Sequence, residues 1–160
     1  MSAGPARSGS ARGLIVAASC LVCLTGISAV QRTPMENTTP KPRILVHATH
    51  GPEHPTRAAL AFLVARTATE EGHSVSVFLA GDAVQLLRDG VLDSLSGVGT
   101  GRLREHYDAI VKGGGRFYLS GMSSHARGFT EVDLKGKPAE LAPPAVLLRL
   151  ALEHDRMFTY

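Results

Sequence analysis

Two arginines, Arg57 and Arg127, are the charged residues best placed to bind an anion. Arg57 lies in the first turn of a predicted helix, where backbone N–H groups have no partner within the helix, and Arg127 precedes Gly128 in a loop after an apolar segment. Free N–H groups and a guanidinium together suit sulfate, phosphate or a carboxylate. An alternative is open for each arginine: Arg57 pairs with Glu53 across the turn, and Arg127 ties its loop to a neighbouring carboxylate.

A second kind of chemistry would use the histidines nearby. His47, His50, Glu53 and His54 surround the end of the first apolar segment, and imidazole and carboxylate groups are common ligands of zinc and other transition metals. However, His47 and His50 span the end of a strand whose side chains alternate between faces, so their spacing alone does not ensure that both reach one ion. We therefore interpret the cluster as a polar loop rim and predict no metal and no cofactor, with His47, His50 and His54 as the metal-ligating alternative.

Nucleophilic catalysis lacks its usual residues. The two cysteines, Cys20 and Cys23, lie in an apolar N-terminal run, and no second ligand pair follows them as a zinc site would require. No thiolate is therefore expected on the folded domain. Ser124 and His125 are adjacent in sequence, so they rarely face each other, and no G-x-S-x-G turn surrounds them. The sequence predicts no catalytic residue.

An alternation of strands and helices must position these residues. Short apolar runs predict strands of a parallel sheet buried on both faces, at residues 43–48, 74–80, 117–119 and 156–160. Helices are predicted between them, at residues 55–71, 81–88, 102–112 and 143–155. The glycine-rich segment 97–101 lacks the Lys-Ser/Thr pair of a phosphate-binding loop and indicates a flexible connector. The alternation implies a doubly wound sheet whose ligands lie at the carboxyl ends of its strands.

The loops at those strand ends define the predicted site. Adjacent central strands place their carboxyl-terminal loops side by side, and the helix that begins at Pro55 directs its N-terminal amides to the same place. Six residues are therefore expected to bind a ligand together: His50, Thr56, Arg57, Ser120, Ser123 and Arg127.

Four segments give the chain a family resemblance: ILVHATHGPEHPTRAALAF, VSVFLAGDAVQLL, FYLSGMSSHARG and ALEHDRMFTY. Between residues 42 and 160 the chain resembles the DsrE/DsrF-like family of sulfur-relay proteins, which includes TusD-type subunits. The resemblance implies a three-layer α/β/α fold with a mostly parallel, doubly wound five-stranded sheet, and cytoplasmic trimers or hexamers. Sulfur-transferring members carry a persulfide on a cysteine after the middle strand, and the matching positions here are Ser120 and Ser123. A serine hydroxyl cannot hold sulfane sulfur and is a poor nucleophile without a base.

Charge and composition exclude nucleic acid as the main partner. Of the 17 Lys and Arg residues, Arg7, Arg12 and Arg32 precede Met35, whereas all 14 Asp and Glu residues follow it. The domain is therefore neutral, and it has no basic stripe, no Trp and an aromatic content of only 5%.

The helix predicted at residues 55–71 is apolar nearly all round in its middle, AALAFLVA. Such a helix is covered on two sides. One side is expected to be the sheet, and the other is open to a second subunit. Self-association through this helix is therefore predicted, with Phe62 in the contact.

Residues 1–41 form an N-terminal extension and linker before the domain at 42–160. The apolar run Leu14–Val30 is interrupted by polar residues and suits a secretory signal or a marginal membrane anchor. A translation start at Met35 is the alternative, which we favour slightly. The location is then cytoplasmic, with export or membrane anchoring through residues 14–30 as the alternative.

Together these observations predict a DsrE/DsrF-like domain without the carrier cysteine, acting as a small-ligand (anion) binding or assembly module. The alternative is a participant in sulfur transfer whose thiol is supplied by a cysteine-bearing relay protein. A purely structural partner subunit for such a protein also fits.

Overall fold

A five-stranded parallel sheet forms the centre of the computed structural model, which describes residues 40–160. Its strand order is β6-β5-β2-β1-β7, and every neighbouring pair is parallel. The strands are β1 (Ile44–Ala48), β2 (Val75–Leu79), β5 (Arg116–Ser120), β6 (Ala139–Ala142) and β7 (Arg156–Thr159). The predicted α/β class and parallel sheet are confirmed.

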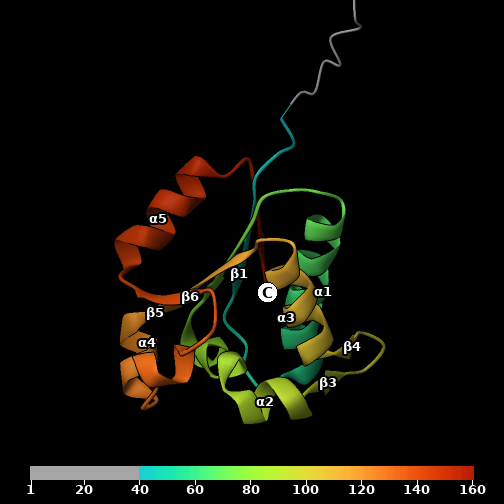
Figure 1. The fold of residues 1–160 in the computed structure, drawn as a ribbon. Coiled ribbons are helices and arrows are strands. Elements are labelled where there is room, and N and C mark those ends of the chain that lie inside the picture. Colours follow the sequence, from blue (N-terminus) through green and yellow to red (C-terminus); the bar gives the residue numbers. More distant parts are fainter. Residues whose placement is uncertain (1–39) are drawn as a thin grey trace, which may run out of the picture. The chain divides into compact units, whose positions relative to one another are not determined.

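Helices cover both faces of the sheet (Figure 1). The long helices α1 (Pro55–Glu70) and α3 (Leu103–Lys112) lie on one face, and α5 (Pro144–Glu153) lies on the other. Shorter elements join them: η1 (Gly81–Leu87), α2 (Asp89–Ser94), α4 (Gly121–Ala126) and η2 (Glu131–Leu134). A two-residue antiparallel pair, β3 (Ser96–Gly97) and β4 (Gly101–Arg102), precedes α3.

Each face of the sheet has its own hydrophobic core, because strand side chains alternate between faces. Under α1 and α3, the ring of Phe117 lies 5.7 Å from that of Phe62 and 5.2 Å from that of Tyr107. Under α5, a smaller core contains Leu45, Phe78, Ala142 and Leu150. The larger core therefore holds α1, and with it the start of that helix, firmly against the sheet.

The second side of α1 is covered within the same chain. Its alanines permit close packing, and Phe62 is fully buried in the core that includes residues of α3. Phe62 is therefore not accessible to a second subunit, and its expected place in such a contact is wrong, whereas self-association itself stays a prediction. The apolar run AALAFLVA reflects a helix enclosed between the sheet and α3.

Two further expectations change in detail. The helix predicted at residues 81–88 is a 3₁₀ helix, η1, and the segment 97–101, expected as a flexible connector, forms the β3–β4 pair. Gly99 and Gly101 have positive φ angles of 73° and 86°, which glycine adopts without strain and which this tight reversal requires. The strand β6 was not among the predicted strands.

Within residues 40–160, no helix combines the length and the apolar character needed to cross a membrane. The predictions for the apolar run 14–30, for Cys20 and Cys23 and for a start at Met35 lie outside the described residues. The domain boundary at residue 42 stays a prediction.

Candidate functional site

The six predicted ligand-binding residues fall into two groups at the carboxyl edge of the sheet. β2 lies between β1 and β5, so the loop after β2 separates the loops after the other two strands. The first group is His50, Thr56 and Arg57; the second is Ser120, Ser123 and Arg127. Contacts through Gly81 and Asp82 connect the second group to the β2 loop. That all six line one crevice stays a prediction.

The first group is organised by a chain of hydrogen bonds. Arg57 donates from Nη1 to Nε2 of His50 over 3.2 Å. The other ring nitrogen, Nδ1, lies 3.4 Å from Oγ1 of Thr49, and that hydroxyl donates to the carbonyl of Tyr160 over 3.0 Å. Because Nε2 accepts from a guanidinium, this network places a proton on Nδ1 of His50.

In the part of the chain that the structure describes, Arg57 has no acidic partner. Within residues 40–160, no carboxylate lies within ion-pair distance of its guanidinium. Glu53, the partner considered from sequence, instead accepts from the backbone N–H of Gly51 over 2.7 Å. The first turn of α1 contains no acid, and His54 at its N-cap makes no side-chain capping hydrogen bond. The N-terminus of α1, the positive end of the helix dipole, therefore has neither a side-chain cap nor an acid in its first turn.

Thr56 serves the β3–β4 turn. Its Oγ1 accepts a hydrogen bond from the backbone N–H of Val98 over 3.2 Å, and this bond holds the turn against the start of α1. A Cβ at Gly97 would lie 3.0 Å from Cα of Thr56, so the glycine permits this close approach. Thr56 therefore lies in the first turn of α1 as predicted, but its hydroxyl already accepts a hydrogen bond from Val98.

In the second group, the two serines support local structure. Oγ of Ser120 accepts from the N–H of Ser123 over 3.4 Å and caps α4, whereas Oγ of Ser123 accepts from the N–H of Gly81 over 3.0 Å. In the described part of the chain, neither hydroxyl hydrogen-bonds to a histidine or a carboxylate. The geometry thus gives neither serine the base that a nucleophile needs.

Arg127 anchors its loop. Its Nε donates to Oδ1 of Asp82 over 2.8 Å, and its Nη1 donates to the carbonyl of Ser123 over 3.2 Å. Arg88 in turn donates to the carbonyl of Arg127 over 3.0 Å. Arg127 was expected either to bind an anion or to tie its loop to a neighbouring carboxylate, and these contacts match the second role. Asp82 was missed as its partner because it lies 45 residues before Arg127 in the sequence, in the loop after a different strand.

The metal alternative finds no geometric support. His47 packs against Phe78, with ring centroids 6.0 Å apart, on the face covered by α5, whereas the rings of His50 and His54 lie 5.0 Å apart before α1. Burial lowers the pKa of His47, and its Nε2 has no hydrogen-bond partner. Among the described residues, no three His, Cys, Asp or Glu side chains are grouped to hold a metal ion.

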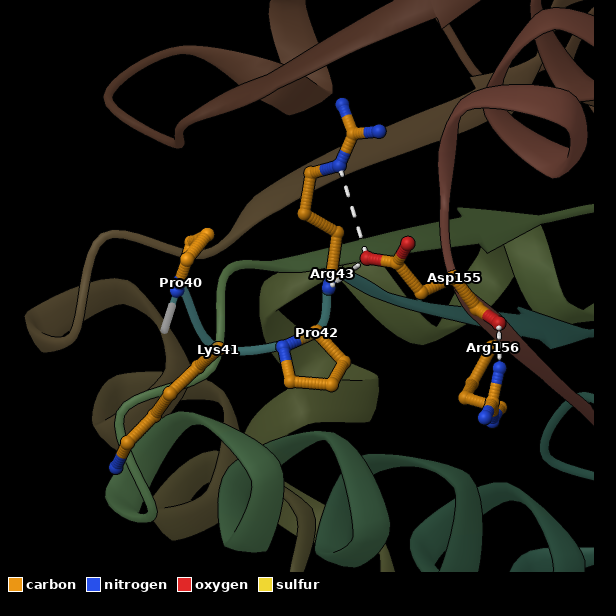
Figure 2. Close-up of a pocket in the computed structure, with 6 residues that line it drawn as sticks. All are labelled: Pro40, Lys41, Pro42, Arg43, Asp155 and Arg156. Atoms are coloured by element: carbon orange, nitrogen blue, oxygen red, sulfur yellow. Dashed lines mark hydrogen bonds and ion pairs between the residues drawn. The ribbon is translucent and has the colours of Figure 1, made fainter. Parts of the chain in front are cut away.

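A hollow of about 440 Å³ lies at the other end of the sheet, where β1 and β7 begin (Figure 2). Lys41, Arg43 and Arg156 line it beside Asp155. The Asp155 carboxylate accepts from the backbone N–H of Arg43 over 2.7 Å, and the Asp155 carbonyl accepts from Arg156 over 2.6 Å. None of the six predicted site residues lines this hollow, so it supports no role for them.

Comparisons with known proteins agree with this fold. A model described as the DsrE/DsrF-like family matches residues 43–160. The crystal structure of the YchN protein from E. coli matches with a TM-score of 0.60 at 16% identity, over 75% of this chain and 100% of YchN. BT1422 from Bacteroides thetaiotaomicron, a conserved protein of unknown function, matches with a TM-score of 0.54 at 9% identity, over 73% of this chain and 94% of BT1422. A search of curated proteins found no match.

Proposed function

The chain belongs to the DsrE/DsrF-like family, and on that premise we propose that its domain binds a small anion beside β1 and carries no sulfur itself. One observation supports the anion site above all others: Arg57 contacts a histidine, has no carboxylate partner within residues 40–160, and lies at a helix start without a side-chain cap. A guanidinium held in this way keeps donors available for sulfate, thiosulfate or phosphate.

The strand order supports the same position. β2, β5 and β6 extend the sheet on one side of β1, whereas β7 lies on its other side, so the order reverses between β1 and β7. Open α/β sheets bind ligands outside the carboxyl ends of the strands at such a reversal. His50 follows β1, and the hydrogen-bond chain from it reaches Tyr160, directly after β7. We therefore assign the anion contact to Arg57, a positioning role to His50, and a loop-shaping role to Ser120, Ser123 and Arg127.

Calorimetric titration of the full chain with sulfate, thiosulfate and phosphate tests the anion site. Arg57→Ala removes a charge-assisted hydrogen bond of about 1.5–3 kcal/mol, so binding should weaken about tenfold or more. Arg127→Ala should weaken binding much less, because Arg127 already pairs with Asp82.

Arg66→Ala is the matched control, since Arg66 lies on the same helix and pairs with Glu70 at 2.7 Å, away from the helix start. The proposal fails if the Arg57 and Arg66 variants bind all three anions like the parent. Equal weakening in Arg57→Ala and Arg127→Ala would instead favour one crevice formed by all six predicted residues.

The absence of sulfur carriage is tested separately. Cys20 and Cys23 are the chain's only cysteines, so the test uses the full chain with both replaced by alanine. After incubation with a persulfide donor, intact mass spectrometry should show no added sulfur. Ser120→Cys in this background is the positive control, because a thiol at a helix N-cap has a lowered pKa and reacts as the thiolate. A stable gain of one sulfur atom by the Ser120 parent would overturn the proposal.

The alternative function is participation in sulfur transfer with the thiol supplied by a relay protein that carries the cysteine. Family membership favours it, and the half-buried Ser120 and Ser123 mark where that thiol would approach. A faster loss of sulfur from a persulfide-loaded partner when this chain is added would support it. We also propose self-association into trimers or hexamers and a cytoplasmic location, which cell fractionation tests.

A further inference from the structure

The strand β7 has one edge without a strand partner in the described part of the chain. Its other edge pairs with β1: Arg156 donates to the carbonyl of Arg43, and Tyr160 donates to that of His47. Because backbone groups alternate in direction along a strand, Arg156, Phe158 and Tyr160 direct theirs toward β1. The N–H and C=O groups of Met157 and Thr159 therefore point away from the sheet.

The side chains of this edge are apolar and accessible. Met157 and Phe158 are each 43% exposed on opposite faces of β7. Phe158 also lines a hollow of about 270 Å³ together with Ile44, Val64 and Ala68. Proteins usually protect an edge strand with charges, proline or a covering segment. Between Arg156 and Thr159, β7 has one charged residue and no proline.

We propose that β7 pairs antiparallel with β7 of a second copy of this chain. One register satisfies all four outward backbone groups of each strand: Met157 opposite Thr159 of the copy, and Thr159 opposite its Met157, each pair exchanging two hydrogen bonds. Registers that place Met157 or Thr159 opposite itself leave the other residue's groups unpaired. The twofold axis then passes through Phe158, and the two sheets become one.

The charges and side chains fit this register. Phe158 faces its own copy in a non-hydrogen-bonded pair, the closer of the two kinds, which favours contact between the rings. Arg156 lies opposite Tyr160 of the copy, so the only charged residue of the strand meets an aromatic ring and no like charge. The second Phe158 would also cover the apolar hollow. A second copy therefore complements the strand better than a charged partner would.

This inference names an interface for the self-association proposed above and rests on it, whereas anion binding has no part in it. A twofold contact gives an even number of subunits, so of the two assemblies named above it selects the hexamer over the trimer.

The test uses the position of Phe158 on the axis. In the full chain under reducing conditions, Phe158→Lys and Phe158→Glu each place like charges opposite one another, so each variant should lose half or more of its assembled mass by light scattering. Mixing the two variants places Lys opposite Glu and should restore the assembly. Val98→Lys, Val98→Glu and their mixture are the control, because Val98 is 86% exposed and far from β7 in sequence.

Each outcome of this test either supports or overturns the proposed β7 interface. A monomeric parent at tens of micromolar would overturn both the self-association and this interface. An odd-numbered parent, an unchanged mass in both Phe158 variants, or a mixture that stays dissociated would overturn the interface alone. If the charged variants melt well below the parent, Met157→Pro replaces them: it removes an outward N–H and leaves the β1 ladder intact, so it should dissociate the assembly without an early melt. A Met157→Pro protein that keeps the parent's mass would overturn the interface.

Discussion

Among the residues at the carboxyl edge of the sheet, the hydrogen bonds separate those with an intramolecular role from those left for a ligand. Ser120, Ser123 and Arg127 each have a recorded partner that fixes a loop. Arg57 has only the imidazole of His50 as a side-chain partner among the described residues. A buried or bonded polar group gains little from a ligand, whereas an unpaired guanidinium gains a charge-assisted bond. These contacts therefore support Arg57 as the anion-binding residue of the proposed site.

His47 should make stability depend on pH. Burial lowers its pKa in the folded state, so between that value and the unfolded value of about 6.5 the unfolded chain binds more protons. Its contribution to stability is fully present above about pH 6.5 and is lost as the pH falls toward the folded pKa. His47→Phe removes this titration, so the variant should lose less stability than the parent between about pH 7 and pH 5.

Urea denaturation at both pH values measures the difference. His125→Gln is the control for the removal of a histidine elsewhere on the domain, since the side chain of His125 is exposed. An identical loss of stability in the parent and in His47→Phe would contradict this account of the buried imidazole.

At the scale of elements, the segment after β5 is held by a cap at η2. The Asp133 carboxylate accepts from the N–H and the hydroxyl of Thr130, over 2.8 and 3.2 Å, and from Arg88 over 3.4 Å. Lys137 donates to the Asp133 carbonyl over 2.8 Å. The hydrogen bond from Thr130, followed by its hydroxyl and nearby cations, lowers the pKa of Asp133. This cap fixes the chain between α4 and β6.

Replacement of Asp133 by alanine should therefore destabilise the domain by about 1–2 kcal/mol near neutral pH, as loss of a helix cap does. Because the folded pKa is lowered, the carboxylate stabilises above its unfolded pKa of about 3.9, and this contribution is lost as the pH falls through the folded value. The difference between parent and variant should accordingly shrink below about pH 4. Glu131→Ala, an exposed change in the same turn, is the control, and urea denaturation of all three proteins is the measurement. Equal stability of the two variants at neutral pH would argue against the cap.

Elements with a strong local pattern were predictable, and elements defined by their neighbours were not. β1, β2 and α1 are long apolar or periodic segments, and their predicted limits agree with the structure within about two residues, the usual scatter of helix and strand ends. β6 is the sequence AELA between Pro138 and Pro143, and only pairing with β5 makes it a strand. Local sequence carries no sign of such a pairing, since tertiary context decides it.

At the scale of the whole molecule, strand order decides which loops can share a ligand. The predicted site joined the loops after β1 and β5 on the assumption that these strands are neighbours. The structure inserts β2 between them, and the partner of Arg127 becomes Asp82, 45 residues away. Nothing in the spacing of His50, Arg57 and Arg127 reveals this order, because strands alternate with helices in the same way for several sheet topologies. The elements that carry the six predicted residues were predictable from the sequence, but the division of these residues into two groups was not.

The final prediction separates folding from assembly. Phe62 is fully buried between α1 and the sheet, so Phe62→Ala should lower the free energy of unfolding by about 3–5 kcal/mol at any protein concentration. Phe158 is partly exposed on the free edge of β7, so Phe158→Ala removes contacts with a second copy more than contacts within the chain.

Stability that comes from association depends on protein concentration. The parent should therefore gain stability on concentration from about 1 to 100 μM, and Phe62→Ala should keep that gain whereas Phe158→Ala should lose it. Urea denaturation of the three proteins at both concentrations measures this, and a parent whose stability does not change with concentration would show that the domain folds without the β7 contact.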